Sequence, residues 1–139
     1  MKEKIFEAKK ENLSSVMEFI DTELEKYEFS MKLITQFNVV IEEIFVNISN
    51  YAYKDGNGIC KIKLDYDGKN KITIIFEDNG IKFNPLDQED PDITLSAEER
   101  EIGGLGIFMV KKMMDNLEYK YEDNKNILTL IKNVWWMEE

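Results

Sequence analysis

The run EEIFVNISNYAY, residues 42–53, contains a carboxylate and an amide four residues apart among mostly apolar neighbours. If this run is helical, Glu43 and Asn47 project from the same face into the same space. Gln36 and Asn50 fall within the same narrow arc, and valines border that arc, which is unusual for a face in contact with water. The pair is therefore a candidate for chemistry. A partly exposed helix with a chance hydrogen-bonded pair would explain the same pattern, and this run alone does not separate the two interpretations.

A second candidate segment is FEDNGIKFNP, residues 76–85, at the end of a run that has the composition of a buried strand. An acidic residue and a glycine at the end of a strand can mark a binding loop. Gly80 would allow a ligand to approach the backbone closely, and Asp78 could accept a hydrogen bond from an exocyclic amine. The alternative is an ordinary Asn-Gly turn without a ligand.

A third candidate segment, REIGGLGIFMVKKMMD at 100–115, contains three glycines within four residues and continues with a helical pattern. Gly103, Gly104 and Gly106 would let backbone N–H groups face an anion, and the start of a helix adds partial positive charge. The Gly-Lys-Ser/Thr of a Walker motif does not follow. The alternative is a glycine-rich loop that simply closes onto a helix.

The composition excludes several classes of function. The chain has 139 residues, of which 43% are hydrophobic, so we expect one folded domain with a substantial core. It contains no histidine, which excludes histidine acid–base catalysis and most zinc sites. A net charge of −10 without a basic run argues against direct binding of nucleic acid. The single cysteine, Cys60, excludes an internal disulfide and is expected to be a small buried hydrophobe. We expect no contact with a membrane and a cytoplasmic location, because no signal peptide or membrane span is recognisable.

Hydrophobic periodicity predicts an α+β fold, a two-layer sandwich of a mixed, mostly antiparallel sheet with helices on one face. No repeat or linker divides the chain, so we expect a single domain over residues 1–139. The expected elements are a strand at 2–8, helices at 12–28 and from a cap at Ser30 to about Tyr53, a hairpin of strands at 61–66 and 71–78, a long loop at 80–103, a helix at 105–114, and a second hairpin of strands at 117–122 and 127–134.

The three candidate segments, in this order and context, resemble the motifs of the GHKL (Bergerat-fold) ATP-binding superfamily, and within it the small anti-sigma factor serine/threonine kinases. Glu43 and Asn47 are similar to the N box of that family. The run Asp78-Asn79-Gly80 with Phe83-Asn84-Pro85 resembles its first glycine box, and Gly103-Gly104-Leu105-Gly106 resembles its second. The resemblance covers essentially the whole chain, and the length is similar to that of kinases made of this domain alone.

The resemblance implies catalytic roles for several residues. Asn47 would hold Mg²⁺ together with the phosphates of ATP, and Glu43 would be the general base toward a hydroxyl of a partner protein. Asp78 would bind the amine of adenine, with Gly80 giving room for the ring. Arg100 would meet the γ-phosphate, at the end of an ATP lid over residues of about 84–102; a surface arginine is the alternative.

The amides of Gly104 and Gly106 would hold phosphates in this resemblance. The residues implied in binding ATP are Asn47, Asn50, Asp78, Gly80, Phe83, Gly103, Gly104, Leu105, Gly106 and Ile107. Two positions depart from the pattern of the family. Tyr51 stands where relatives often have histidine, and Ile102 stands where the relatives that bind sigma factors often have arginine. We expect the ATP site to tolerate both, whereas the choice of partner and the efficiency of transfer could change.

The function implied by the resemblance is that of an ATP-dependent serine/threonine kinase in a partner switch. Such a kinase phosphorylates a small antagonist protein and binds a sigma factor, and relatives form homodimers through the sheet. The main alternative is a regulatory module that binds nucleotide and a partner without significant kinase activity. Retention of Glu43 favours the kinase, because nucleotide binding alone has less need of a base. A third interpretation, an acidic domain without a nucleotide site, would require three coincidences in the right order.

Overall fold

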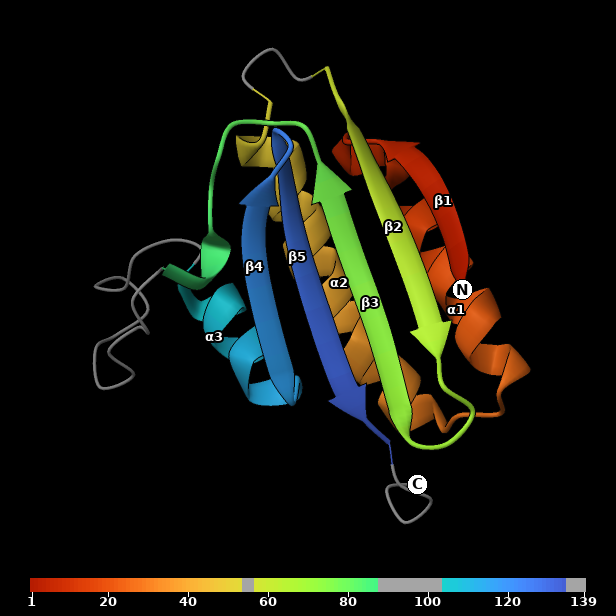
Figure 1. The fold of residues 1–139 in the computed structure, drawn as a ribbon. Coiled ribbons are helices and arrows are strands. Elements are labelled where there is room, and N and C mark those ends of the chain that lie inside the picture. Colours follow the sequence, from red (N-terminus) through yellow and green to blue (C-terminus); the bar gives the residue numbers. More distant parts are fainter. Residues whose placement is uncertain (54–56, 88–103, 135–139) are drawn as a thin grey trace.

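The computed structural model describes residues 1–53, 57–87 and 104–134. The sheet has five strands, and Figure 1 shows that it forms one layer with the α-helices packed behind it. The elements in chain order are β1 (Lys2–Glu7), the short 3₁₀-helix η1 (Lys10–Asn12), α1 (Leu13–Lys26), α2 (Met31–Tyr51), β2 (Ile59–Tyr66), β3 (Lys71–Asp78), the 3₁₀-helix η2 (Pro85–Asp87), α3 (Gly104–Met113), β4 (Asn116–Glu122) and β5 (Lys125–Asn133).

The strands are arranged in the order β1-β2-β3-β5-β4, and every neighbouring pair is antiparallel. The expected α+β sandwich with helices on one face is therefore confirmed, and within the described residues the sheet contains no parallel pair. The central strand β3 pairs with β2 on one side and with β5 on the other. It places the end of the first hairpin beside the start of β5, the second strand of the other hairpin, and so brings residues far apart in sequence together at one end of the sheet.

The core lies between the sheet and the helices. Ile62, Ile74 and Phe76 alternate with partly exposed residues along β2 and β3, as expected for strands with one covered face. Ile41 and Phe45 of α2 are completely buried against them. Cys60 is also fully buried, so its predicted role as a small hydrophobe is confirmed.

Helix α2 begins where the sequence predicts. The hydroxyl of Ser30 accepts a hydrogen bond from the backbone N–H of Leu33 at 3.2 Å and so caps the first turn. The helix ends at Tyr51, two residues before the expected end. The carbonyl of Ala52 instead accepts a hydrogen bond from the N–H of Ile81 at 2.8 Å, which ties the end of the helix to the loop after β3.

The hairpin between β4 and β5 differs from the prediction. The expected connection ran from 122 to 126, whereas the turn consists of only Asp123 and Asn124, both with positive φ, at 54° and 62°. Two left-handed residues in a row form the type of tight turn that matches the twist of a hairpin. Strand β5 consequently begins two residues earlier than predicted, and Asn126 lies within the strand, opposite Asp78 of β3.

The face of the sheet that the helices leave uncovered contains several apolar side chains. Ile75 of β3 lies at its centre, with Ile131 and Ile127 of β5 beside it and Ile5 and Ile59 toward the β1 edge. Among the resolved charge pairs on this face, the ammonium of Lys63 lies 3.0 Å from the carboxylate of Glu77.

Candidate functional site

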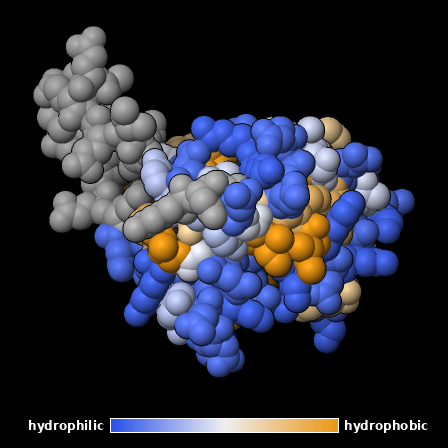
Figure 2. All heavy atoms as spheres, turned by 90° about the horizontal axis from the view of Figure 1, so that it is seen from above, coloured by the Kyte–Doolittle hydropathy of each residue, from blue (hydrophilic) through white to orange (hydrophobic). Residues whose placement is uncertain are grey.

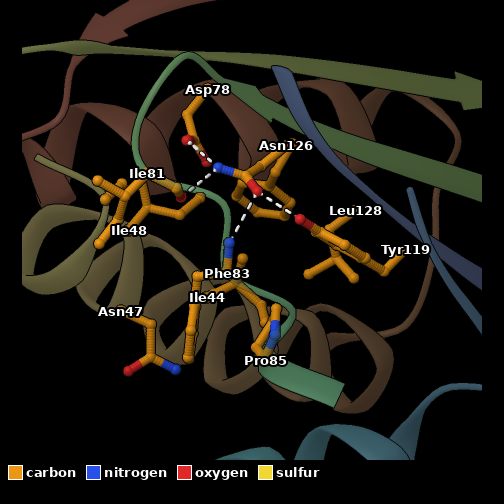
Figure 3. Close-up of a pocket in the computed structure, with 12 residues that line it drawn as sticks. Ile44, Asn47, Ile48, Asp78, Ile81, Phe83, Pro85, Tyr119, Asn126 and Leu128 are labelled. Carbon is orange, nitrogen blue, oxygen red and sulfur yellow. Dashed lines mark hydrogen bonds between the residues drawn. The ribbon is translucent and has the colours of Figure 1, made fainter. Parts of the chain in front are cut away.

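A cavity opens at the end of the sheet where β3 stops and β5 begins, under the second half of α2. Figure 3 shows that residues from strands β3, β4 and β5, from helix α2 and from the segment after β3 converge on it. The walls are mostly apolar, and the polar groups are few. The lining residues are Ile44, Asn47, Ile48, Ala52, Phe76, Asp78, Ile81, Phe83, Pro85, Tyr119, Asn126 and Leu128. An apolar slot with a few convergent polar groups is typical of a site for a small molecule.

Asp78 is the acidic group of this cavity, and it is only 6% exposed. Its Oδ1 accepts hydrogen bonds from the N–H of Gly80 and from the side-chain amide of Asn126, both at 2.9 Å. Burial raises the pKa of the Asp78 carboxyl, and these two hydrogen bonds oppose the rise. Because both hydrogen bonds from described residues fall on Oδ1, the second oxygen remains available to accept from a ligand.

Asn126 is the residue of the site that sequence reasoning missed. Its amide nitrogen donates to Asp78 and to the carbonyl of Ile81, and its oxygen accepts from the N–H of Phe83 and the hydroxyl of Tyr119. The prediction placed Asn126 in a loop because it did not recognise Asp123-Asn124 as a two-residue turn. Consecutive residues that tolerate positive φ were the available signal.

The loop after β3 is also fixed to the end of α2. The hydroxyl of Tyr53 accepts a hydrogen bond from the N–H of Asn79 at 2.9 Å and donates to the carbonyl of Ile59 at 2.6 Å. A Cβ on Gly80 would lie 2.2 Å from the carbonyl oxygen of Ala52, so only glycine lets the two segments approach this closely. Tyr51, at the position where relatives often have histidine, is half exposed and packs against the ring of Phe83.

Glu43 and Asn47 lie one turn apart on α2, and Asn47 lines the cavity. The amide nitrogen of Asn47 lies 3.4 Å from Oε1 of Glu43, a long hydrogen bond that turns the amide oxygen of Asn47 away from the carboxylate. The first turn of α3 approaches the same carboxylate so closely that a Cβ on Gly106 would lie 2.0 Å from its carbon. Burial raises the pKa of Glu43, the hydrogen bond from Asn47 opposes the rise, and nearby Glu42 adds to it. Two of the three candidate segments thus meet at Glu43.

Of the other predicted site residues, some line the cavity, some lie elsewhere in the fold, and some lie outside the described residues. Phe83 lines the cavity, Asn50 is exposed on α2 and is not among the lining residues, and Gln36 faces a separate groove near the start of that helix. The side chain of Ile107 is 1% exposed and belongs to the core, so only its backbone could face a ligand. Gly104 and Leu105 begin α3. Arg100, Ile102, Gly103 and all of the expected lid beyond 87 lie outside the described residues.

The end of the molecule that carries the cavity is mostly hydrophilic, with small hydrophobic patches among the hydrophilic residues (Figure 2). Ile59 at the start of β2 and Ile81 after β3 are exposed hydrophobic residues of segments that lie at this end.

Among the described residues, no three acidic or cysteine side chains are grouped in a way that could hold a metal ion. Within the same residues, no helix has the length and apolarity needed to cross a membrane.

Comparison with known families identifies the fold as that of an ATPase domain. The family model described as histidine kinase-like ATPase domain matches residues 6–132, so this chain belongs to that family. It is similar to the anti-sigma F factor of Clostridium kluyveri, with 29% identity over 73% of this chain and 71% of the relative.

Two further relatives carry the name serine-protein kinase RsbW. The protein from Listeria monocytogenes is 26% identical over 72% of this chain and 66% of its own length. The protein from Bacillus cereus is 27% identical over 72% of this chain and 64% of its own length. The resemblance to the GHKL superfamily and its anti-sigma kinase branch is thereby confirmed.

Proposed function

We propose that this protein is an ATP-dependent serine/threonine kinase that acts as an anti-sigma-type partner switch. It phosphorylates a serine or threonine of a small antagonist protein and binds a sigma factor in the cytoplasm. Membership of the ATPase family and the names of the anti-sigma and serine-kinase relatives support this function. The observation that carries the proposal is the contact between the carboxylate of Glu43 and the first turn of α3, beside Asn47.

The adenine of ATP occupies the apolar cavity in this proposal. Its exocyclic amine donates to the free oxygen of Asp78, and the ring packs against side chains such as Ile81 and Phe83. The triphosphate then extends toward the start of α3, where the N–H groups of the first turn have no partner within the helix. In this arrangement the triphosphate passes Asn47 and its γ-phosphate lies near Glu43. These positions agree with the roles that the resemblance implies, Asn47 at the magnesium ion and Glu43 at the acceptor hydroxyl.

The residues present fit a magnesium ion that accompanies ATP. The hydrogen bond to Glu43 uses the amide nitrogen of Asn47 and leaves its oxygen as a neutral ligand for the ion. A single protein ligand is suitable, because Mg²⁺ usually keeps several waters and takes other ligands from the substrate phosphates. When bound, Mg²⁺ supplies neutralisation of the charge that develops on the phosphates during transfer.

Glu43 acts as the general base in the proposed reaction. Its carboxylate takes the proton of the acceptor hydroxyl while the hydroxyl oxygen forms a bond to the γ-phosphorus of ATP. The bond between that phosphorus and the bridging oxygen breaks, and ADP leaves. A partly buried carboxylate with a raised pKa is a better proton acceptor than a fully solvated one, which suits Glu43 to this role.

We further propose that two copies associate through the uncovered face of the sheet. The face presents Ile5, Ile59, Ile75, Ile127 and Ile131, and burying such side chains against a second copy is favourable. The partner proteins remain free to bind elsewhere, because the cavity opens at the end of the sheet and not on this face.

The decisive experiment is calorimetric titration of ATP with and without Mg²⁺, combined with a transfer assay that uses γ-labelled ATP and a cell extract of the source organism. The wild type should bind ATP and label a protein on serine or threonine. Asn47→Ala should lose the Mg²⁺-dependent part of the affinity, and Glu43→Ala should still bind ATP but label nothing. Binding without any labelling by the wild type would instead support the regulatory module. Failure of the wild type to bind ATP would refute the proposal.

A further inference from the structure

Asn126 is nearly inaccessible to solvent, with 6% of its surface exposed, and both the nitrogen and the oxygen of its side-chain amide form hydrogen bonds within the protein. Its nitrogen faces acceptors only: Oδ1 of Asp78 at 2.9 Å, the carbonyl of Ile81 at 2.8 Å and, at 3.5 Å, the carbonyl of Gly80. Its oxygen faces donors only, namely the N–H of Phe83 at 3.1 Å and the hydroxyl of Tyr119. These partners fix the orientation of the amide, because a reversed amide would place donor against donor and acceptor against acceptor.

The position of Asn126 explains how one side chain can reach all these groups. It lies in β5 directly opposite Asp78 in the antiparallel register, 48 residues away in sequence. Side chains opposite each other on one face of a sheet lie close enough for direct contact. Tyr119, on β4, approaches the same amide from the other side and also lines the cavity.

We propose that Asn126 is a specificity-determining positioning residue: its amide occupies one oxygen of Asp78 and leaves the other as a fixed acceptor, so that the site accepts a 6-amino purine and rejects a 6-oxo purine. This inference rests on the proposed binding of ATP and names the residue that selects the base. Asp78 is the group that touches the base, and Asn126 acts through it.

The chemistry of the pair explains the selectivity. The amide nitrogen can only donate, so an ionised Asp78 beside it presents a pure acceptor to the cavity. A 6-amino purine offers an N–H donor at that place, whereas a 6-oxo purine offers a carbonyl oxygen, which the carboxylate repels. Sites built to hydrogen-bond a substrate N–H group discriminate strongly against analogues that lack it.

Asn126→Asp is the most informative substitution, because it keeps the shape and changes only the donor. The new carboxylate would face Asp78 at hydrogen-bond distance, and two such carboxylates share a proton. Asp78 could then carry that proton and donate to a 6-oxo base. The ratio of ATP affinity to ITP affinity, measured by calorimetry, should fall at least about tenfold relative to the wild type.

Tyr53→Phe provides the matched control. It removes the hydroxyl that accepts from the N–H of Asn79 in the same loop and donates to the carbonyl of Ile59, but it leaves Asp78 and Asn126 paired. If Asn126 selects the base, this variant should weaken the binding of ATP and of ITP by the same factor. The ratio of the two affinities should then equal that of the wild type. An equal fall of the ratio in Tyr53→Phe and Asn126→Asp would overturn the inference, since loop order alone would then control selectivity.

Tyr119→Phe tests the same inference if the Asn126→Asp variant does not fold. It removes only the hydroxyl that donates to the oxygen of Asn126, so the amide is held less firmly and the ratio should fall a few-fold. A ratio equal to that of the wild type in every folded variant of Asn126 or Tyr119 would overturn the inference. Wild-type protein that binds no ATP would refute the proposed function itself, whereas an unchanged ratio in the variants refutes only the role of Asn126.

Discussion

Glu43 and Asp78 are both partly or fully buried carboxylates, but their surroundings suit them to different tasks. Asp78 is held by two hydrogen bonds of 2.9 Å and is almost inaccessible, which fixes its oxygens for recognition. Among the described residues, Glu43 accepts the long hydrogen bond from Asn47, its carboxylate lies against Gly106 of α3, and it is partly open to solvent. A proton acceptor must be able to reach the reacting hydroxyl, so the looser residue is the better base.

Substituting Glu43 should separate catalysis from binding. Glu43→Gln keeps the size and the contact with α3 but cannot accept a proton, so phosphoryl transfer should fall at least about 100-fold. The affinity for ATP should stay within about threefold, because the base interacts with the acceptor hydroxyl and not with the nucleotide. Single-turnover transfer and calorimetry measure the two effects.

Glu42→Gln is the control for this substitution. Glu42 is the adjacent residue, it is exposed, and its substitution removes the same charge. It should leave transfer nearly unchanged. Equal losses in both variants would indicate that net charge near the site, and not proton transfer by Glu43, controls the rate.

Asp78 should make recognition of the base dependent on pH. Burial raises its pKa above the ordinary 3.8, and in the proposed complex the ionised form accepts from the amine. The preference for ATP over ITP should therefore decline on acidification, beginning at a pH above 3.8. Protonation of the phosphates affects the affinities for ATP and ITP equally, so its effect cancels in the ratio of the two affinities. A ratio that is constant down to the pH at which the protein unfolds would contradict this role.

At the level of the elements, amphipathic patterns predicted most of the fold. The cap at Ser30 and the alternation in β2 and β3 are local signals, and both are confirmed. The partners of Asp78 are not local. Whether Asn126 faces Asp78 depends on the length of the turn before it, and moving a register by one residue reverses every side chain. The arc on α2 likewise failed to distinguish Asn47, which lines the cavity, from Asn50, which does not.

The contact between α2 and α3 leads to a prediction about Gly106. Alanine normally stabilises a helix relative to glycine by about 1 kcal/mol, but here its Cβ would lie 2.0 Å from the carboxylate of Glu43. Because that carboxylate ends a flexible side chain, it should move aside. Gly106→Ala should therefore remain folded, without loss of thermal stability, while phosphoryl transfer falls at least about tenfold.

Gly68→Ala should show the opposite pattern. Gly68 has a φ of 79° in the turn between β2 and β3, and nothing lies within 4 Å of an added Cβ. The strained backbone should cost about 1 kcal/mol of stability, and transfer should be unaffected because this turn is at the far end of the sheet from the cavity. If Gly106→Ala also lost stability and kept its activity, the assignment of Glu43 as the base would be weakened.

The whole molecule is strongly acidic, with a net charge of −10. The uncovered face of its sheet nevertheless carries an apolar strip, which consists of Ile5, Ile59, Ile75, Ile127 and Ile131. Two such molecules repel each other through their charges, so the apolar strip must offset that repulsion if a dimer forms. The balance between the two effects depends on salt, because screening weakens the repulsion between charges and leaves the apolar contact intact.

Ile75→Glu tests the dimer. Ile75 lies at the centre of the uncovered face, so a charge there should dissociate the proposed dimer, with a loss of association of at least about 100-fold in sedimentation experiments. Thr22→Glu, on the exposed surface of α1, adds the same charge away from the face and should leave association unchanged. A wild type that is monomeric at high protein concentration and high salt would exclude this interface.

The order of the strands has a consequence for the synthesis of the chain. Strand β3 is synthesised before its second neighbour, β5, which follows about 50 residues later and is the last strand of the sheet to be made. Until then Asp78 lacks Asn126, and the cavity lacks the wall that Tyr119 and Leu128 provide. The nascent chain therefore cannot use ATP as a folding ligand, and the helices and the first three strands must persist without it. An incomplete chain released by the ribosome would have no nucleotide site with which to act on its partners.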